Sequence, residues 1–98
     1  MRTCFLCGAN GALDPLEEHH IFHGPLRKKA DRLGLTVWLC GWKCHREGPK
    51  SAHRCRETDL KLKAYGQRKA MREQGWNIPR FIREFGRNYI DLEESENE

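Results

Sequence analysis

Long hydrophobic runs are missing from this sequence. No window approaches the ~18 consecutive apolar residues that a membrane-spanning helix requires, and the opening MRTCFLC contains no apolar stretch typical of a secretory signal peptide. No internal repeat is visible, and low-complexity sequence is confined to the last eight residues. These absences predict a cytoplasmic protein that has no membrane partner and works in a reducing compartment.

Hydrophobic residues are also scarce over the whole chain. They make up 38% of the 98 residues, whereas charged residues make up 33%. A single domain of this size has a marginal core, and such domains commonly need a metal ion or covalent cross-links. We therefore expect residues 1–90 to form one small domain that a metal ion stabilises. Residues 91–98 are predicted to be a disordered acidic tail, because they have almost nothing to bury.

Acidic residues are few outside that tail. Five of the 14 Asp and Glu residues lie in the last eight positions, so residues 1–90 carry 18 Lys and Arg against 9 Asp and Glu. A compact domain with this excess attracts polyanions, of which nucleic acid is the commonest. A basic surface that serves only solubility would have the same composition, so the charge favours DNA as a partner without establishing it.

Cysteine, in contrast, is abundant and clustered. Four of the five cysteines form the pairs Cys4-Phe-Leu-Cys7 and Cys40-Gly-Trp-Lys-Cys44. Two turns that each present two thiolates can complete the tetrahedron of a structural zinc ion. An odd cysteine count and a reducing compartment argue against the alternative, a disulfide framework. The second pair has three intervening residues instead of the commoner two, so Cys55 is an alternative to Cys44 as the fourth ligand.

Local patterns predict an α+β fold around these cysteines. The connection that contains Gly48-Pro49 is expected to be a turn, after which Ser51 caps a short helical start with His53 in its first turn. The C-terminal helices are expected within residues 57–89. Strands are predicted at residues 17–22 and 35–39, and helices at residues 26–33, 58–74 and 79–85, the last of them capped by Asn77.

Histidines are more numerous near the cysteines than one zinc tetrahedron can use. His19, His20 and His23 lie between the two cysteine pairs, and His45 and His53 follow the second pair. Imidazole ligands suit a borderline cation such as Zn²⁺ or Mn²⁺, whereas an all-oxygen Mg²⁺ site would need carboxylates. We therefore expect a second metal site with a different task. His23 is expected to be a surface or phosphate-contacting residue.

The order of these motifs resembles the HNH endonucleases of the ββα-metal superfamily. A fuller set of segments is similar to the phage RecA-dependent nuclease, or recombination enhancement, family. The resemblance covers roughly residues 4–66 and implies a small zinc-stapled ββα-metal domain with a helical insertion and C-terminal helices. Besides the first cysteine pair, the matching segments are His19-His20-Ile21-Phe22-x-Gly24, Leu39-Cys40, Cys44-His45-Arg46, Ala52-His53 and Lys63-Ala64-Tyr65-Gly66.

The function that this resemblance implies is metal-dependent hydrolysis of DNA phosphodiester bonds. Elementary chemistry gives the same outline, because the reaction needs a base to activate water and a cation to neutralise developing charge. By the resemblance His20 is the general base, while His19, His45 and His53 hold a divalent ion (Mg²⁺, Mn²⁺ or Zn²⁺). The resemblance also implies a RecA-like recombinase filament as a partner, and the bacterial host cell of a phage or prophage as the location.

The sequence departs from the family pattern at the asparagine position and in the spacing of the second cysteine pair, and strand alternation is in tension with the roles of two histidines. His19 and His20 should point to opposite faces, because side chains alternate along a strand. The asparagine that orients the family's base corresponds to Leu35, and Thr36 is the nearest polar substitute. These departures keep an alternative open, a non-catalytic zinc-knuckle DNA-binding or adaptor protein. Either function could use the same phosphate-clamping residues, namely Arg27, Lys28, Arg32 and Arg46.

Overall fold

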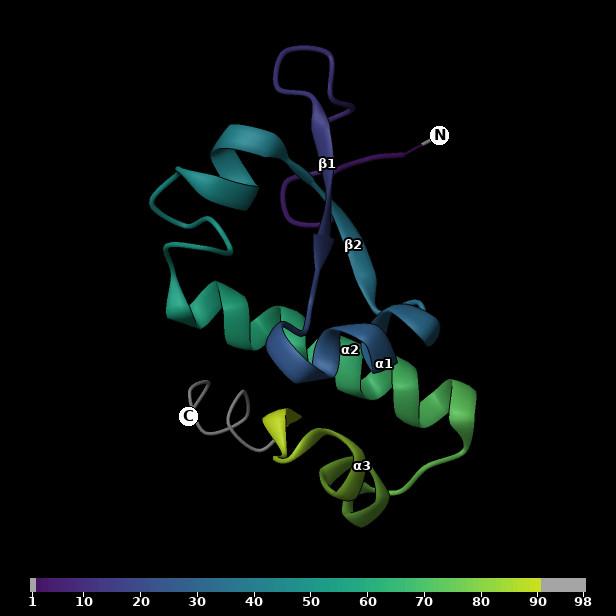
Figure 1. Ribbon diagram of the computed structural model, residues 1–98. Helices are drawn as coiled ribbons and strands as arrows, with labels where there is room; N and C mark the ends of the chain where they lie inside the picture. The colour runs from purple at the N-terminus through teal and green to yellow at the C-terminus, as the bar shows by residue number, and fades with distance from the viewer. Residues whose placement is uncertain (1, 91–98) are drawn as a thin grey trace.

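The computed structural model describes residues 2–90 as a small α+β fold, so the prediction of that class is confirmed (Figure 1). The predicted acidic tail, residues 91–98, lies outside the described residues. Within the described part of the chain, no helix is both long and apolar enough to cross a membrane. The elements in chain order are β1 (Leu16–His20), η1 (Gly24–Leu26), α1 (Arg27–Arg32), β2 (Thr36–Cys40), η2 (Gly41–Arg46), α2 (Arg56–Gln74) and α3 (Ile78–Phe85).

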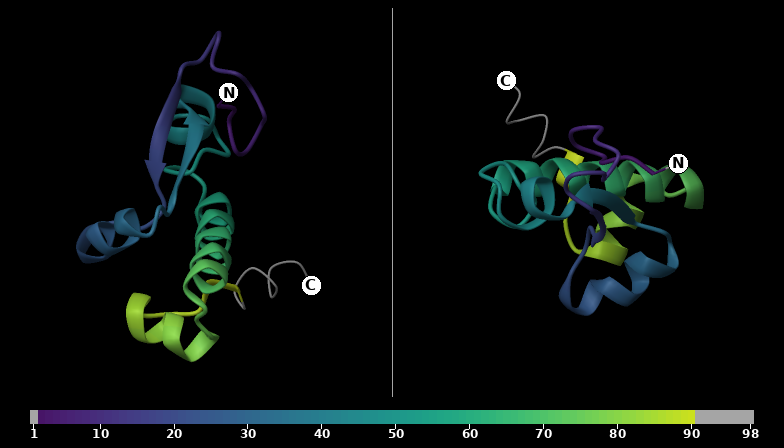
Figure 2. Two further views of the ribbon diagram at one scale, coloured as in Figure 1. Left: turned by 90° about the vertical axis from the view of Figure 1, so that its right-hand side faces the viewer. Right: turned by 90° about the horizontal axis from the view of Figure 1, so that it is seen from above.

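The two strands pair antiparallel, with η1 and α1 inserted between them. His19 is opposite Val37 and His20 is opposite Thr36 in the register. Because paired residues share a face and successive residues alternate, His19 and His20 lie on opposite faces, as the alternation argument predicts. In the two orthogonal views of the hairpin, the end of β1 that carries both histidines points toward α2 (Figures 1 and 2).

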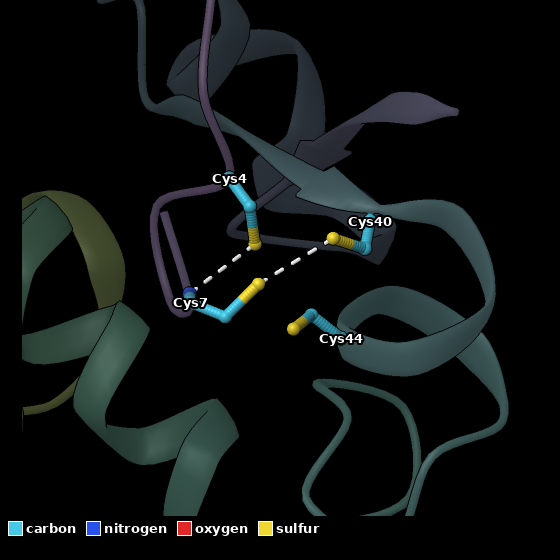
Figure 3. Close-up of side chains that lie close together, drawn as sticks. All are labelled: Cys4, Cys7, Cys40 and Cys44. Carbon is cyan, nitrogen blue, oxygen red and sulfur yellow. Dashed lines mark hydrogen bonds between the residues drawn. The ribbon is translucent and has the colours of Figure 1, made fainter. Parts of the chain in front are cut away.

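The N-terminal turn is attached to the hairpin by the backbone. The Phe5 N–H donates to the Trp38 carbonyl at 2.8 Å, and the Gly8 N–H closes the turn on the Cys4 carbonyl at 2.8 Å. Gly8 has a φ of 79°, a left-handed conformation that favours glycine. The result is that the first cysteine pair lies beside the end of β2, where the second pair begins (Figure 3).

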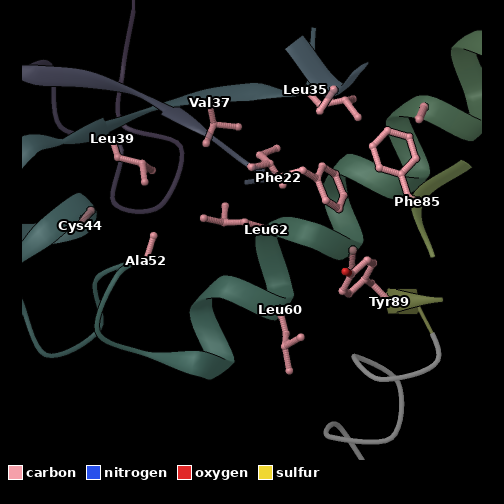
Figure 4. Close-up of a cluster of buried hydrophobic side chains, with 14 of the residues drawn as sticks. Phe22, Leu35, Val37, Leu39, Cys44, Ala52, Leu60, Leu62, Phe85 and Tyr89 are labelled. Carbon is pink, nitrogen blue, oxygen red and sulfur yellow. The ribbon is translucent and has the colours of Figure 1, made fainter. Parts of the chain in front are cut away.

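The hydrophobic core joins the end of β1 to the helices (Figure 4). Phe22 is buried, and its ring centroid lies 4.8 Å from that of Phe85 and 5.7 Å from that of Tyr89. Gly66 of α2 permits this packing, because a Cβ there would be 3.1 Å from Phe22 and 3.3 Å from Ile21. The residues immediately after His20 therefore fix the strand end against α2.

The helix ends agree with the sequence in one case and differ in another. Asn77 caps α3 as its side-chain oxygen accepts from the Arg80 N–H at 2.9 Å. The predicted helical start at Ser51 is wrong, because the chain forms a turn up to residue 54 and α2 begins at Arg56. The Ser51 hydroxyl is buried and has no hydrogen-bond partner among the described residues, so it caps nothing.

Candidate metal centres

Four cysteines converge on one point in the structure. The sulfur atoms of Cys4, Cys7, Cys40 and Cys44 all lie within 4.8 Å of one another, and those of Cys7 and Cys40 are 3.5 Å apart (Figure 3). Zinc–sulfur bonds of about 2.3 Å in a tetrahedron separate the sulfurs by roughly 3.8 Å. The cluster is therefore compatible with a structural zinc ion. Cys44 belongs to it, whereas Cys55 lies outside it beside His53.

The turn that carries Cys44 is unusually wide. In η2 the Glu47 N–H donates to the Trp42 carbonyl at 2.8 Å, an i to i+5 bond that characterises a π-helical turn. Such a turn accommodates the extra residue between the cysteines of the second pair. Its start is held by Asp14, whose carboxylate accepts from the N–H groups of Trp42 and Lys43 at 3.0 and 2.9 Å.

Three thiols of the cluster differ in acidity. Burial opposes ionisation of Cys4, but hydrogen bonds from the backbone N–H groups of Cys40, Cys7 and Leu6 outweigh it and lower the pKa of Cys4 to about 6. Burial raises the pKa of Cys40 to about 12 and also raises the pKa of Cys44. Only a bound cation would stabilise all the thiolates together at neutral pH.

Three histidines from three different elements form a second group. His19 from β1, His45 from η2 and His53 from the turn before α2 have ring nitrogens within 4.8 Å of one another. His19 is 1% exposed, and neither of its ring nitrogens has a hydrogen-bond partner in residues 2–90. A buried imidazole without any partner is costly unless it binds something. This group could therefore hold a metal ion.

A carboxylate orients one of these imidazoles. Glu17 Oε1 lies 2.8 Å from His45 Nδ1. A carboxylate only accepts, so Nδ1 carries the proton and Nε2 keeps the lone pair that can bind a metal. Arg46 Nε lies 3.1 Å from the same Glu17 oxygen and donates to the Gly41 carbonyl at 3.1 Å. The predicted phosphate contact of Arg46 would therefore compete with these contacts.

A pocket of about 410 Å³ opens beside the histidines. His23 and Asp59 line it, and together with His19 they form another group whose ligand atoms lie within 4.8 Å of one another. Asp59 carries no local sequence signal of a site, and the sequence predicted a surface or phosphate-contacting role for His23. The pocket lining consists of His23, Ala52, His53, Arg54, Cys55, Arg56 and Asp59.

His20 lies outside both histidine groups and has a partner of its own. Its Nδ1 is 2.9 Å from Asp31 Oδ1, which belongs to α1. The hydroxyl of Thr36 instead donates to Glu18 at 3.0 Å. Thr36, the nearest polar substitute for the family's asparagine, is therefore not bonded to His20, whereas Asp31 is. Glu17 and Asp31 gave no local sequence signal, because their partners lie 28 and 11 residues away.

The predicted basic residues of the insertion helix are exposed. Arg27, Lys28 and Arg32 all lie on the solvent side of α1. Lys29 of the same helix instead donates to the Glu84 carbonyl at 2.9 Å, which ties α1 to α3.

Comparison of the chain with protein-family models, with curated proteins and with solved structures gave no significant match.

Acidification is expected to destabilise the protein through His19. Burial, followed by repulsion from His45 and His23, lowers the pKa of His19 from 6.5 to about 3. Between these values the unfolded chain binds more protons than the folded one, so this stabilisation is present above pH 6.5 and is lost as the pH falls. A change from pH 7 to 5 should lower the free energy of unfolding by about 2 kcal/mol.

Urea unfolding at several pH values would measure this effect. His19→Gln is the matched variant, because it keeps a polar side chain but removes the titrating group. Its stability should depend less on pH than that of the wild type. Equal slopes for the two proteins between pH 5 and 7 would contradict the assignment to His19.

Proposed function

We propose that the protein is a metal-dependent DNA endonuclease of the HNH type. The observation that carries this proposal is the buried His19, whose two unpartnered ring nitrogens lie among His23, His45, His53 and Asp59. A protein that only binds DNA has no need for such a group beside a cysteine cluster that already suits structural zinc. The resemblance to the ββα-metal superfamily, with two strands and a following helix around these residues, supports the same function.

The histidine group would hold the catalytic divalent ion. Three imidazoles, from His19, His45 and His53, favour Zn²⁺ or Mn²⁺ over Mg²⁺. A cation there would polarise the phosphate and neutralise the charge that develops on its oxygens. Glu17 keeps the Nε2 lone pair of His45 available, so it is a positioning residue for this ion.

His20 would act as the general base. Asp31 accepts from Nδ1–H of His20, so the Nε2 lone pair is left to take a proton from the attacking water. Adjacent Cα atoms are about 3.8 Å apart, and His19 and His20 therefore project from one point of β1 to its two faces. A phosphate lying across the end of the strand could contact the ion on one side and the base on the other.

DNA binding is expected to depend on α1 and to be sensitive to salt. The exposed Arg27, Lys28 and Arg32 would contact phosphates, and each contact releases counterions from DNA. Replacing all three by alanine should weaken binding to every sequence about equally, and should reduce the slope of log affinity against log salt. Fluorescence anisotropy with two unrelated duplexes, at salt concentrations from about 50 to about 200 mM, would measure the affinities and the salt slope. An unchanged slope would contradict this interface.

Incubation of supercoiled plasmid with the protein and Mg²⁺, Mn²⁺ or Zn²⁺ tests the proposal. Relaxed or linear product that a chelator abolishes would support a nuclease. The assay should use both naked DNA and DNA coated with a RecA-like recombinase, because the resemblance suggests such a filament as a partner. The resemblance also suggests the cytoplasm of a bacterial host as the location. A gel shift without cleavage in either form would support the binding or adaptor protein instead.

A further inference from the structure

One histidine is common to both groups of potential ligands that contain imidazole. His19 lies with His45 and His53 in one group and with His23 and Asp59 in the other. The ring centroid of His19 is 5.1 Å from that of His45 and 5.6 Å from that of His23. The first group would use residues of η2 and the turn after it, whereas the second would use the loop after β1 and the first turns of α2.

The two ring nitrogens of His19 indicate whether this residue binds one cation or two. A neutral imidazole has one lone pair and one N–H, and a single ion uses only the lone pair. Metal-binding histidines ordinarily donate the other N–H to a carboxylate, a carbonyl or water, as Glu17 receives it from His45. His19 has no such acceptor in residues 2–90, and its exposed fraction is 1%. Both nitrogens are therefore left to be satisfied by ligands from outside the chain.

We propose that His19 bridges two cation positions, one completed by His45 and His53 and the other by His23 and Asp59. When both ions bind, the His19 N–H proton leaves to solvent, and each ring nitrogen donates one lone pair. The second position has two imidazoles and one carboxylate, a set that suits Zn²⁺ or another borderline divalent cation. It opens on the pocket of about 410 Å³, which gives an ion and its remaining water ligands access.

The second ion would connect the loop after β1 to α2. Asp59 already accepts from Lys63 Nζ at 2.9 Å through Oδ2, and a carboxylate has a second oxygen for a metal. His23 is exposed and the pocket is open, so His23 and Asp59 can be replaced without creating a cavity in the core. Substitutions of these two residues therefore test the site without testing the fold.

Counting zinc ions per chain tests the bridge. Full-length protein would be titrated with Zn²⁺ against a chromophoric chelator, and thermal unfolding would be followed in the same samples. The wild type should bind two ions beyond the one expected in the cysteine cluster. His23→Ala and Asp59→Asn should each remove one of these two ions and reduce the rise in melting temperature caused by Zn²⁺. Glu57→Gln, an exposed acidic control on the same helix, should retain both.

Two further variants complete the pattern. His53→Ala should remove the other ion, and His19→Gln should remove both. A wild-type count of one ion beyond the cysteine cluster, or an unchanged count in Asp59→Asn, would overturn the bridge. This inference rests on the cation site of the proposed function but is measured without cleavage. If the wild type bound two ions beyond the cysteine cluster but never cut DNA, the nuclease proposal would be refuted. The proposal that His19 bridges two cations would be unaffected.

Discussion

Replacing Cys7 by serine is expected to leave the protein without a stable fold. Structural zinc sites contribute roughly 10–16 kcal/mol of apparent binding free energy, whereas a small domain is stable by only about 5–15 kcal/mol in total. Cys7 is exposed, so the substitution itself removes little packing. Loss of structure would therefore report loss of the ion. Far-UV circular dichroism together with the zinc content of purified protein would measure it.

Cys55→Ser is the matched control for this experiment. Cys55 lies outside the four-sulfur cluster and is only partly buried, so the variant should keep its fold and its cysteine-bound zinc. A folded, zinc-free Cys7→Ser protein would contradict the structural role of the cluster. If Cys55→Ser unfolded while Cys44→Ser remained folded, Cys55 would be the fourth zinc ligand in place of Cys44.

His20→Ala is expected to lower DNA cleavage by roughly 10²–10⁴-fold, the usual contribution of a general base. Histidine is the side chain most often used to take a proton from an attacking water. His20 belongs to neither group of potential metal ligands, so zinc content, folding and DNA affinity should change little. Single-turnover cleavage at saturating metal would measure the effect. Wild-type rates in the variant would exclude His20 as the base and make His53 the next candidate.

Asp31 should affect cleavage by orienting the His20 ring. Two variants of Asp31 separate this effect from a contribution to packing. Asp31→Asn keeps the size of the side chain, but its amide can also donate and so no longer enforces the Nδ1–H tautomer. Cleavage should fall in kcat with little change in KM, and Asp31→Glu should recover part of the loss. Thr36→Val is a control on the opposite strand, since the Thr36 hydroxyl bonds to Glu18 instead. Equal losses in Thr36→Val and Asp31→Asn would contradict the assignment.

The parts of the fold that depend on local chemistry could be predicted from the sequence. The cysteine pairs are signalled by spacing, the β2 strand by its β-branched and aromatic residues, and the start of α3 by the Asn77 cap. The opposite orientation of His19 and His20 followed from strand alternation alone. Ser51 misled the prediction because a cap residue is also a common turn residue, and here the chain turns once more before α2.

The contacts that assemble the histidine site could not be predicted in this way. Glu17 meets His45 only because η2 folds back on β1, and Asp31 meets His20 only because α1 is inserted between the paired strands. Asp59 reaches His19 because Gly66 allows α2 to pack closely on the end of β1. Each of these pairings is a tertiary contact, and the acidic residue in each pair carries no local sequence signal of a metal site.

Addition of Mn²⁺ to protein that carries one zinc per chain tests whether the histidine group is a catalytic metal site. We expect the protein to be folded before Mn²⁺ is added. Cleavage of labelled duplex DNA should rise from background to a plateau with Mn²⁺, and the circular dichroism spectrum should barely change. His45→Ala should need a higher Mn²⁺ concentration for the same rate, because it loses one ligand of the histidine group. DNA that stays bound but uncut at every Mn²⁺ concentration, with and without recombinase, would contradict the claim that the histidine group is a catalytic site.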